Sequence, residues 1–332
     1  MSLEPLYVLG GQQRGARPMS GGLDWYEYER GLILQVDPAS GTVVRRVAYE
    51  SPSGSRVADD PVVLFKSASR VGDTLYACTQ TEVMTYHLPD FSRTNYLSLP
   101  RFNDVHHVRP TADGTWLVAI SGLDQVVEVE PGGQVRREWS VVDGEGPWDR
   151  FDPGIDYRLV RTTKPHHAHP NHVFQLGDEV WATRFEQRDA ISLTRPGRRI
   201  AIDLERPHDG LVHDGRVWFT TVNGKVVVAD AASLAIVEVI ELADFQASAE
   251  PLGWARGIHM DEAGGLWVGF SRIRPTKFRE NVAWLARGFK NVRPTRIDRY
   301  DLASRRLTHS IDLEPAGLSA VFSVHSAAPA QG

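Results

Sequence analysis

The sequence is poor in cysteine, in long apolar runs and in net charge of either sign, and each shortage excludes something. A single cysteine, Cys78, rules out an internal disulfide and indicates a reducing compartment. No stretch reaches the roughly 20 apolar residues that span a bilayer, and the N-terminus has neither the basic start nor the apolar run of a signal peptide. A net charge of -5 gives no reason to expect a nucleic acid or a membrane as partner. We therefore expect a cytoplasmic protein.

Familiar catalytic signatures are also missing. The sequence has no Walker loop, nucleophile elbow, CxxC pair or dinucleotide fingerprint. Helical periodicity is scarce outside residues 278–290, where apolar residues recur at three- and four-residue spacing. Motifs thus indicate none of the enzyme classes that those signatures mark, and the pattern favours an all-β chain.

What the sequence does contain is a repeated hairpin that opens on a histidine and ends on a tryptophan. The four copies run over residues 107–116, 172–181, 208–218 and 259–267. A further copy at 65–76 ends on Tyr76 and has no histidine. We interpret the aligned aromatic residues as packing between repeats, because a large ring at one fixed place is what such packing requires.

A second hairpin, with alternating strands around a Pro/Gly/Ser-rich turn, recurs six times. Its copies begin at residues 32, 83, 126, 190, 226 and 297. The two hairpins together predict one domain over residues 1–332, a six-bladed β-propeller with four strands per blade, with seven blades as the alternative. Strands near residues 318–324 and 5–9 are expected to close the ring from both termini, which removes an exposed sheet edge.

The long connections all fall on one predicted face of the ring. They are residues 11–30, 50–62, 141–168 and 272–296, whereas the turns on the other face are uniformly short. The four repeated histidines begin the innermost strands and belong to the same loop-rich face. Because loops vary where function is built, we expect the functional site on this face.

Histidines from separate blades would converge near the propeller axis. We predict that His107, His172, His208 and His259 bind a divalent transition metal, one of Fe, Zn, Cu, Ni or Mn. Further candidates in the same region are His106, His166, His167 and His169. Two alternatives stay open: the histidines line a channel through ordinary hydrogen bonds, or they act as metal-free acid–base groups.

Other residues near the predicted mouth are less specific. We predict catalytic roles for Asp209, Tyr157 and Arg256, and substrate-binding roles for Lys66, Ser67, Arg272, Arg274 and Lys277. The cations among them are suited to a substrate carboxylate or phosphate, but equally to ordinary ion pairs. The basic segment 272–296 is interpreted as a lid, a dimer contact or a solvated face.

The blade pattern resembles the six-bladed propeller superfamily of gluconolactonase/strictosidine-synthase-like and NHL-like proteins. Relatives of that kind often bind calcium through carboxylates and an asparagine on the axis, where this sequence has histidines. In that one respect it is similar to carotenoid-cleaving oxygenases and some polysaccharide lyases. The resemblance and the histidines together suggest a metal-dependent lyase or cyclase, oxygenase or hydrolase for a small anionic or carbonyl-bearing molecule. The alternative is a non-catalytic propeller that binds a small ligand or a protein partner.

Overall fold

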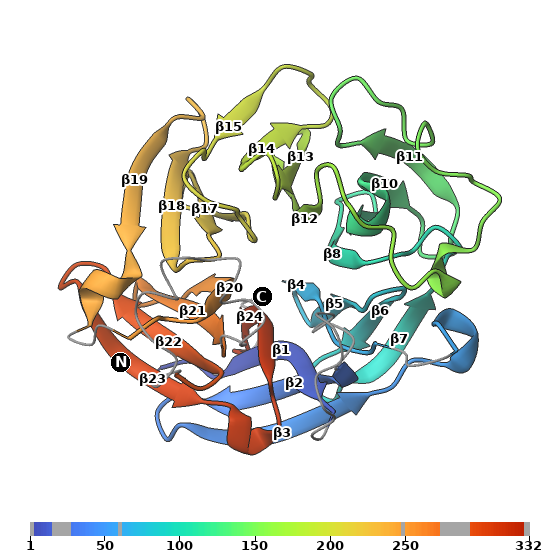
Figure 1. The fold of residues 1–332 in the computed structure, drawn as a ribbon. Helices are drawn as coiled ribbons and strands as arrows, with labels where there is room; N and C mark the ends of the chain where they lie inside the picture. Colours follow the sequence, from blue (N-terminus) through green and yellow to red (C-terminus); the bar gives the residue numbers. More distant parts are fainter. Residues whose placement is uncertain (1–2, 15–27, 59–61, 247–249, 273–292, 329–332) are drawn as a thin grey trace.

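The computed structural model describes residues 3–14, 28–58, 62–246, 250–272 and 293–328. Over these residues the chain forms six four-stranded antiparallel sheets arranged around a central axis (Figure 1). The six-bladed propeller that the repeats predict is therefore confirmed.

Each sheet runs outward from an innermost strand. The first comprises β24 (Ala320–Ser326), β1 (Leu6–Gln13), β2 (Tyr28–Asp37) and β3 (Thr42–Tyr49), and the second β4 (Ser67–Val71), β5 (Thr74–Cys78), β6 (Val83–His87) and β7 (Ser92–Leu97). The third comprises β8 (Val105–Pro110), β9 (Trp116–Ile120), β10 (Gln125–Val129) and β11 (Val135–Ser140), and the fourth β12 (Pro170–Leu176), β13 (Glu179–Arg184), β14 (Asp189–Ser192) and β15 (Arg199–Ala201). The last two comprise β16 (Leu211–His213), β17 (Arg216–Thr220), β18 (Lys225–Asp230) and β19 (Ile236–Glu241), then β20 (Trp254–Met260), β21 (Gly265–Ser271), β22 (Arg296–Asp301) and β23 (Arg306–Asp312).

Helical structure in the described residues is limited to single 3-10 turns in connections. They cover Ser53–Ser55, Ser121–Leu123, Tyr157–Leu159, Leu242–Phe245 and Glu314–Ala316. No helix in this part of the chain is long and apolar enough to cross a membrane. The helix predicted over residues 278–290 lies outside the described residues.

The ring is closed by strands from the two ends of the chain, as predicted. Strand β24 pairs antiparallel with β1 from Leu6↔Ser326 to Gly11↔Ala320. The C-terminal strand thereby becomes the innermost strand of the sheet that the N-terminus begins, and its backbone groups are paired rather than left at an open edge.

The core consists of apolar layers between neighbouring sheets. The repeated tryptophans all lie on the second strand of their sheets and are buried, and Tyr76 occupies the corresponding place on β5. Tyr76 and Trp116 from adjacent sheets meet edge to face, with ring centroids 6.1 Å apart. This is the inter-blade packing role expected from the repeat.

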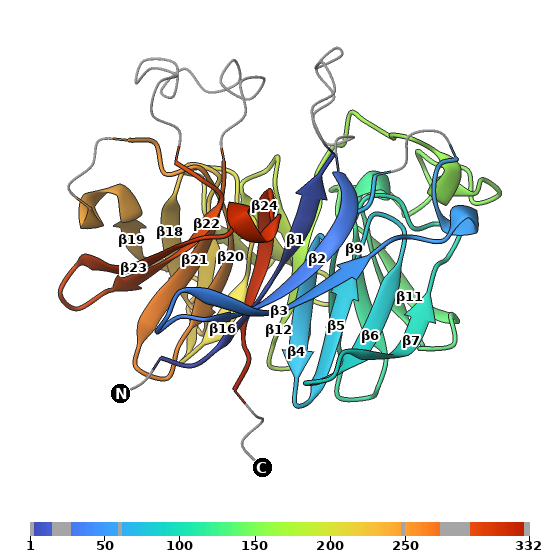
Figure 2. The same ribbon diagram turned by 90° about the horizontal axis from the view of Figure 1, so that it is seen from below.

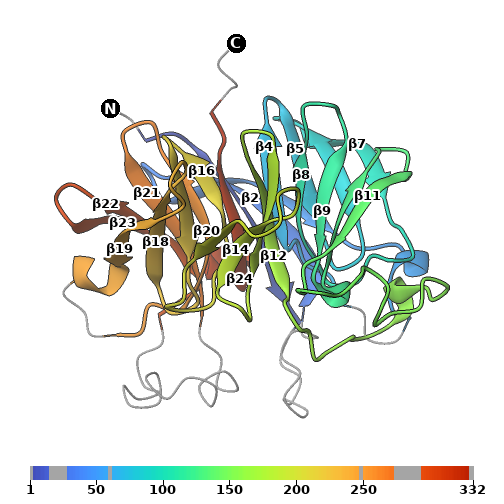
Figure 3. The same ribbon diagram turned by 90° about the horizontal axis from the view of Figure 1, so that it is seen from above.

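Long connections gather at one end of the ring, and short turns such as that between β4 and β5 lie at the other (Figures 2 and 3). The crossover from β3 to β4 and the crossover from β11 to β12 reach this loop-rich end. The connection predicted over residues 11–30 has fewer residues than expected, because β1 continues to Gln13 and β2 already begins at Tyr28.

Four of the innermost strands carry a β-bulge near their loop-rich end. The extra residues are His106 on β8, Asn171 on β12, one of Arg256 and Gly257 on β20, and Phe322 on β24. Gly257 has a φ of +84°, which a residue with a side chain adopts only with strain. A bulge changes the direction in which the side chains on either side of it point. The four bulges therefore direct side chains of the innermost strands towards the axis.

Candidate functional site

Each of the six sheets contributes one large side chain to a group that we call the axial belt. The belt comprises Lys66 before β4, His106 on β8, His169 before β12, His208 before β16, Arg256 on β20 and Phe322 on β24. All six lie towards the loop-rich end of the innermost strands. All except Phe322 are at least nine-tenths buried.

Contacts connect the belt around the axis. Phe322 lies under two cations, with Arg256 Cζ 4.5 Å and Lys66 Nζ 5.6 Å from its ring centroid. The rings of His106 and His169 meet at 4.6 Å. Phe185 links His169, at 5.3 Å, to His208, at 5.5 Å. His208 completes the circuit, since its Nδ1–H donates to the carbonyl of Ala255, the residue before Arg256, at 2.9 Å.

One part of the belt brings together groups that are typical metal ligands. A carboxylate oxygen of Asp104 and ring nitrogens of His166 and His169 all lie within 4.8 Å of one another. The two Nδ1 atoms of the histidines face each other at 2.6 Å, so one of them carries the hydrogen and donates it. Lys66 Nζ lies 3.0 Å from Asp104 Oδ1. No other such group of three histidine, cysteine or acidic residues occurs in the described ranges.

The electrostatics of this cluster favour the ligand forms of all three groups. Burial by itself raises the pKa of Asp104, but the charge of Lys66 and the neighbouring histidines outweigh it and hold the pKa well below its usual value. Burial lowers the pKa of His166 and takes that of His169 well below its usual value. An ionised carboxylate and two neutral imidazoles at pH 7 are the states that coordinate a metal.

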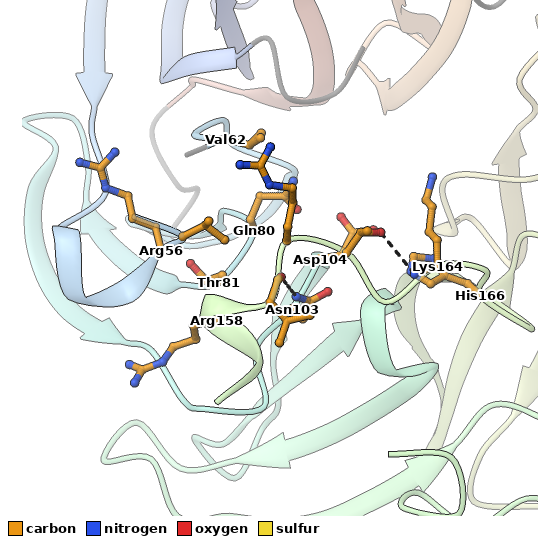
Figure 4. A pocket seen from close by; sticks show the side chains of 13 residues that line it. Arg56, Val62, Gln80, Thr81, Asn103, Asp104, Arg158, Lys164 and His166 are labelled. Carbon is orange, nitrogen blue, oxygen red and sulfur yellow. Dashed lines mark hydrogen bonds between the residues drawn. The ribbon is translucent and has the colours of Figure 1, made fainter. Parts of the chain in front are cut away.

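A pocket adjoins the cluster on the side of the long crossovers (Figure 4). Asp104 and His166 line it directly, and the remaining lining comes from the crossovers 50–66 and 141–169, from the β5–β6 loop and, through Asn103, from the β7–β8 connection. The lining residues are Arg56, Val57, Val62, Gln80, Thr81, Asn103, Asp104, Arg158, Val160, Arg161, Thr162, Lys164 and His166. A molecule in the pocket therefore lies against two of the three candidate ligands.

The charged residues that line the pocket are predominantly basic. Asp104 is its only acidic member among the described residues, against four basic residues, Arg56, Arg158, Arg161 and Lys164. Arg158 is held by Asp156 at 2.6 Å, whereas Arg56 forms no hydrogen bond or ion pair within the described part of the chain. Such a lining attracts an anion.

The structure places two of the four predicted metal ligands between blades rather than in this cluster. The rings of His107 and His172 stack with centroids 3.6 Å apart. Both nitrogens of His107 are engaged: Nδ1 accepts from the backbone N–H of Val173 at 3.3 Å, so Nε2–H donates to Ser69 Oγ at 3.2 Å. The β8 bulge explains this, because it sends His106 to the belt and His107 towards the next blade.

The other two predicted ligands lie apart from that stack. His208 donates through Nδ1, and its Nε2 accepts from Trp254 Nε1 at 3.3 Å. His259 lies near the opposite end of β20, where its Nε2 is 2.9 Å from Glu4 Oε1. The four histidines thus occupy three separate environments, and the structure does not bring them together around one point.

Of the three predicted catalytic residues, two lie near the axial belt and one lies away from it. Asp209 and Arg256 lie at or beside the belt, both buried. Burial raises the pKa of Asp209 and lowers that of Arg256 to about 10. Tyr157 does not line the pocket: it packs in the core, and its hydroxyl accepts from the backbone N–H of Asp152 at 2.9 Å. It fixes the crossover rather than facing a substrate.

The predicted substrate-binding residues also lie in different parts of the structure. Lys66 is in the belt and binds Asp104, and Ser67 is buried on β4, where its carbonyl faces the Cys78 thiol. Arg272 lies away from the pocket and pairs with Glu314, 2.6 Å from Nε to the carboxylate. Arg274 and Lys277 lie outside the described residues.

Sequence reasoning missed Asp104, Arg56 and Phe322. Asp104 has a visible signal, since it stands two residues before the His106–His107 pair at the start of a predicted inner strand. Phe322 gives none, because only the β24 bulge directs it to the axis. His166 and His169, in contrast, belong to the dense histidine segment 166–172 that the sequence already marks.

Comparisons with known proteins support the fold. No protein-family model and no curated protein matches the sequence. A Bacteroides caccae protein of unknown function has a similar structure, with a TM-score of 0.62 and 14% identity over 97% of this chain and 98% of that chain. Virginiamycin B lyase from Staphylococcus aureus gives a TM-score of 0.44 with 14% identity over 75% of this chain and 69% of that chain. The first likeness is one of fold.

Proposed function

We propose that this protein is an enzyme that binds a divalent transition metal through Asp104, His166 and His169 and acts on a small anionic or carbonyl-bearing molecule. The observation that carries the proposal is the convergence of one carboxylate and two imidazoles, with ligand atoms within 4.8 Å, at the loop-rich end of the axis. Two histidines and one carboxylate suit iron(II), zinc or manganese and leave coordination positions open for a substrate.

The surroundings of the cluster support an anionic substrate. Asp104 and His166 line a pocket whose other charged members are all basic. A bound metal would polarise a substrate carbonyl or carboxylate oxygen. Arg56, which has no partner in the described residues, is available to hold the anion in the pocket.

Asp209 is the acid–base group that we assign to the reaction. Its Oδ2 accepts from Thr220 Oγ1 and from the backbone N–H of Gly257, while Oδ1 accepts no hydrogen bond from a described residue. Burial raises its pKa, so its proton is held more tightly than that of an exposed aspartate. A buried carboxyl with one free oxygen is suited to hold or deliver a proton.

One observation favours the alternative, a non-catalytic propeller that binds a small anion. The three candidate ligands have polar partners without a metal, since Asp104 forms an ion pair with Lys66 and the two histidines share a hydrogen bond. The metal measurement therefore decides between the two functions.

The first experiment is elemental mass spectrometry of tag-free protein purified without chelators, together with titration by Co(II) followed by visible absorption. We expect close to one metal per chain in the wild type and none in His166→Ala/His169→Ala. The double variant His107→Ala/His172→Ala tests the other ligand set, and the exposed His213→Ala is the matched control. Both should retain the metal.

Each outcome has a definite meaning. Metal retained by the His166/His169 variant, or lost only from the His107/His172 variant, would refute the ligand assignment. A wild type that neither contains metal nor binds Co(II) at pH 7.5 would leave the anion-binding alternative. If metal is found, its identity directs the assay, because iron indicates oxygen chemistry and zinc or manganese indicates Lewis-acid chemistry.

A further inference from the structure

Arg256 differs from the other deeply buried arginines of this protein. Arg184, Arg296 and Arg299 each pair with an aspartate, at 2.7 Å, 2.9 Å and 2.6 Å respectively. Arg256 is only 4% exposed, yet no described carboxylate or carbonyl accepts a hydrogen bond or forms an ion pair with it. Burying a cation without such a partner costs folding free energy, so an unpaired buried guanidinium indicates a binding site for an anionic ligand.

Nothing else in the belt neutralises this guanidinium. Asp209 is the carboxylate whose charge acts most strongly on it, but the two form no ion pair, and one oxygen of Asp209 is already engaged by Thr220 and Gly257. The guanidinium carbon of Arg256 lies 4.5 Å from the centre of the Phe322 ring. Burial accordingly lowers the pKa of Arg256 to about 10.

The Arg256 guanidinium is not completely shielded from solvent. The nitrogens of Arg256 are not among the fully enclosed polar atoms of the described residues. The β20 bulge at Arg256 and Gly257 sets the side chain at the loop-rich end of the axis, and the Phe322 ring holds it in place. Packing that fixes a guanidinium beforehand lowers the entropy lost when an anion binds.

We propose that Arg256 is the receptor for a carboxylate group of the substrate, bound through paired N–H donors of the guanidinium. This inference rests on the proposed function, since the carboxylate belongs to the molecule that the metal would activate. Phe322 connects Arg256 to Lys66, and Lys66 contacts Asp104, so the receptor and the candidate metal ligands form one continuous wall.

The belt favours a carboxylate over a phosphate. A planar carboxylate matches the fork of one guanidinium and carries a single negative charge. A phosphate would bring up to two charges, and the only other cation in the belt, Lys66, is already paired with Asp104.

The test uses metal-free protein, so that it does not depend on the metal site. Saturation-transfer NMR measures binding of acetate, lactate and benzoate, each beside its neutral amide, and of inorganic phosphate, at constant ionic strength. The variants are Arg256→Gln and Arg256→Lys. The control is Arg195→Gln, which removes an exposed arginine paired with Asp178. Co(II) titration of every variant monitors the metal site in parallel.

We expect at least one carboxylate to bind the wild type at least about tenfold more tightly than its amide. Arg256→Gln should weaken that carboxylate at least about tenfold, Arg256→Lys should weaken it less, and Arg195→Gln should leave it unchanged. Co(II) binding should be the same in all of them.

Three results would overturn the inference. The first is that the wild type binds no carboxylate more tightly than its amide, and the second is that Arg256→Gln, Arg256→Lys and the wild type all bind the carboxylate with equal affinity. The third is that Arg256 binds phosphate more tightly than any carboxylate. If Arg256→Gln does not fold, the amide comparison on the wild type and the lysine variant still decide. Carboxylate binding without any Co(II) binding would refute the proposed function and leave the receptor standing.

Discussion

Lys66 and Asp104 form a buried ion pair in the axial belt, with Nζ 3.0 Å from Oδ1 and side chains only 3% and 12% exposed. The pair joins the innermost strand of one sheet to the entry of the next. It also places a fixed positive charge directly on a carboxylate that we assign to a metal. Lys66 and a metal ion would therefore compete for the same oxygen.

Replacing Lys66 by methionine should separate the two roles of this pair. We expect the metal-free Lys66→Met protein to lose about 3–5 kcal/mol of unfolding free energy, because Asp104 is left as an uncompensated buried charge. Its affinity for Co(II) should rise at least about tenfold, since the competing cation is gone. Chemical denaturation with and without Co(II) measures both effects.

Lys225→Met is the matched control, because it breaks the more exposed pair with Glu241 away from the belt. It should change stability by less than about 1 kcal/mol and leave Co(II) affinity unaltered. Unchanged or weaker Co(II) binding in Lys66→Met would contradict the placement of the metal on Asp104.

Stability should fall as the pH drops below 6.5. Burial holds the pKa values of five histidines well below 6.5 and lowers that of His325 to about 3; the five are His106, His107, His169, His172 and His208. The unfolded chain then binds protons that the folded protein does not. Stability is complete above pH 6.5 and decreases by up to about 1.4 kcal/mol per histidine for each pH unit below it.

Urea unfolding at pH 8, 7, 6 and 5 measures this slope. His172→Gln removes one of these groups and should reduce the slope by about 1.4 kcal/mol per pH unit. His87→Gln replaces an exposed histidine and should leave the slope as it is. A stability that does not change between pH 7 and 5 would show that these histidines are not buried as neutral groups.

Closure of the ring depends on a close approach between β1 and β24. A Cβ atom on Gly10 would lie 1.8 Å from the carbonyl oxygen of Ala320 and 3.2 Å from Leu318 Cδ1. Gly10→Ala should therefore push β24 away and cost about 1–3 kcal/mol or more, with faster hydrogen exchange in β24. Gly132→Ala is the control, because its Cβ would meet nothing within 4 Å. Equal stability of the two variants would argue against this closure.

The fold could be predicted from the sequence, whereas the candidate site could be predicted only in part. The reason is that the two depend on different numbers of residues. Strands such as β10 and the buried Trp116 can be predicted from the alternation of apolar and polar residues and from the repeated hairpins. Many residues contribute to each of these patterns, so no single residue decides the prediction. The direction of an axial side chain depends on a single extra residue in a strand. His106 and His107 exchange roles through the β8 bulge, and no local pattern announces where that bulge falls.

The pocket wall beside Arg56 is fixed by one carboxylate in the β5–β6 loop. Glu82 is completely buried and accepts hydrogen bonds from five hydroxyl groups, those of Tyr49, Ser51, Ser55, Thr79 and Tyr96. No described lysine, arginine or histidine forms an ion pair with it. Ser51 and Ser55 belong to the β3–β4 crossover, which also carries Arg56 of the pocket lining.

Glu82→Gln should therefore loosen that crossover as well as destabilise the protein. The amide nitrogen cannot accept, so at least one buried hydroxyl loses its acceptor, and we expect a loss of about 2–4 kcal/mol. Hydrogen exchange in residues 50–58 should accelerate before the rest of the sheet responds. Glu130→Gln, which removes a partly exposed pair with Arg136, should cost less than about 1 kcal/mol. Exchange in 50–58 that stays as slow as in the wild type would show that Glu82 does not hold the pocket wall.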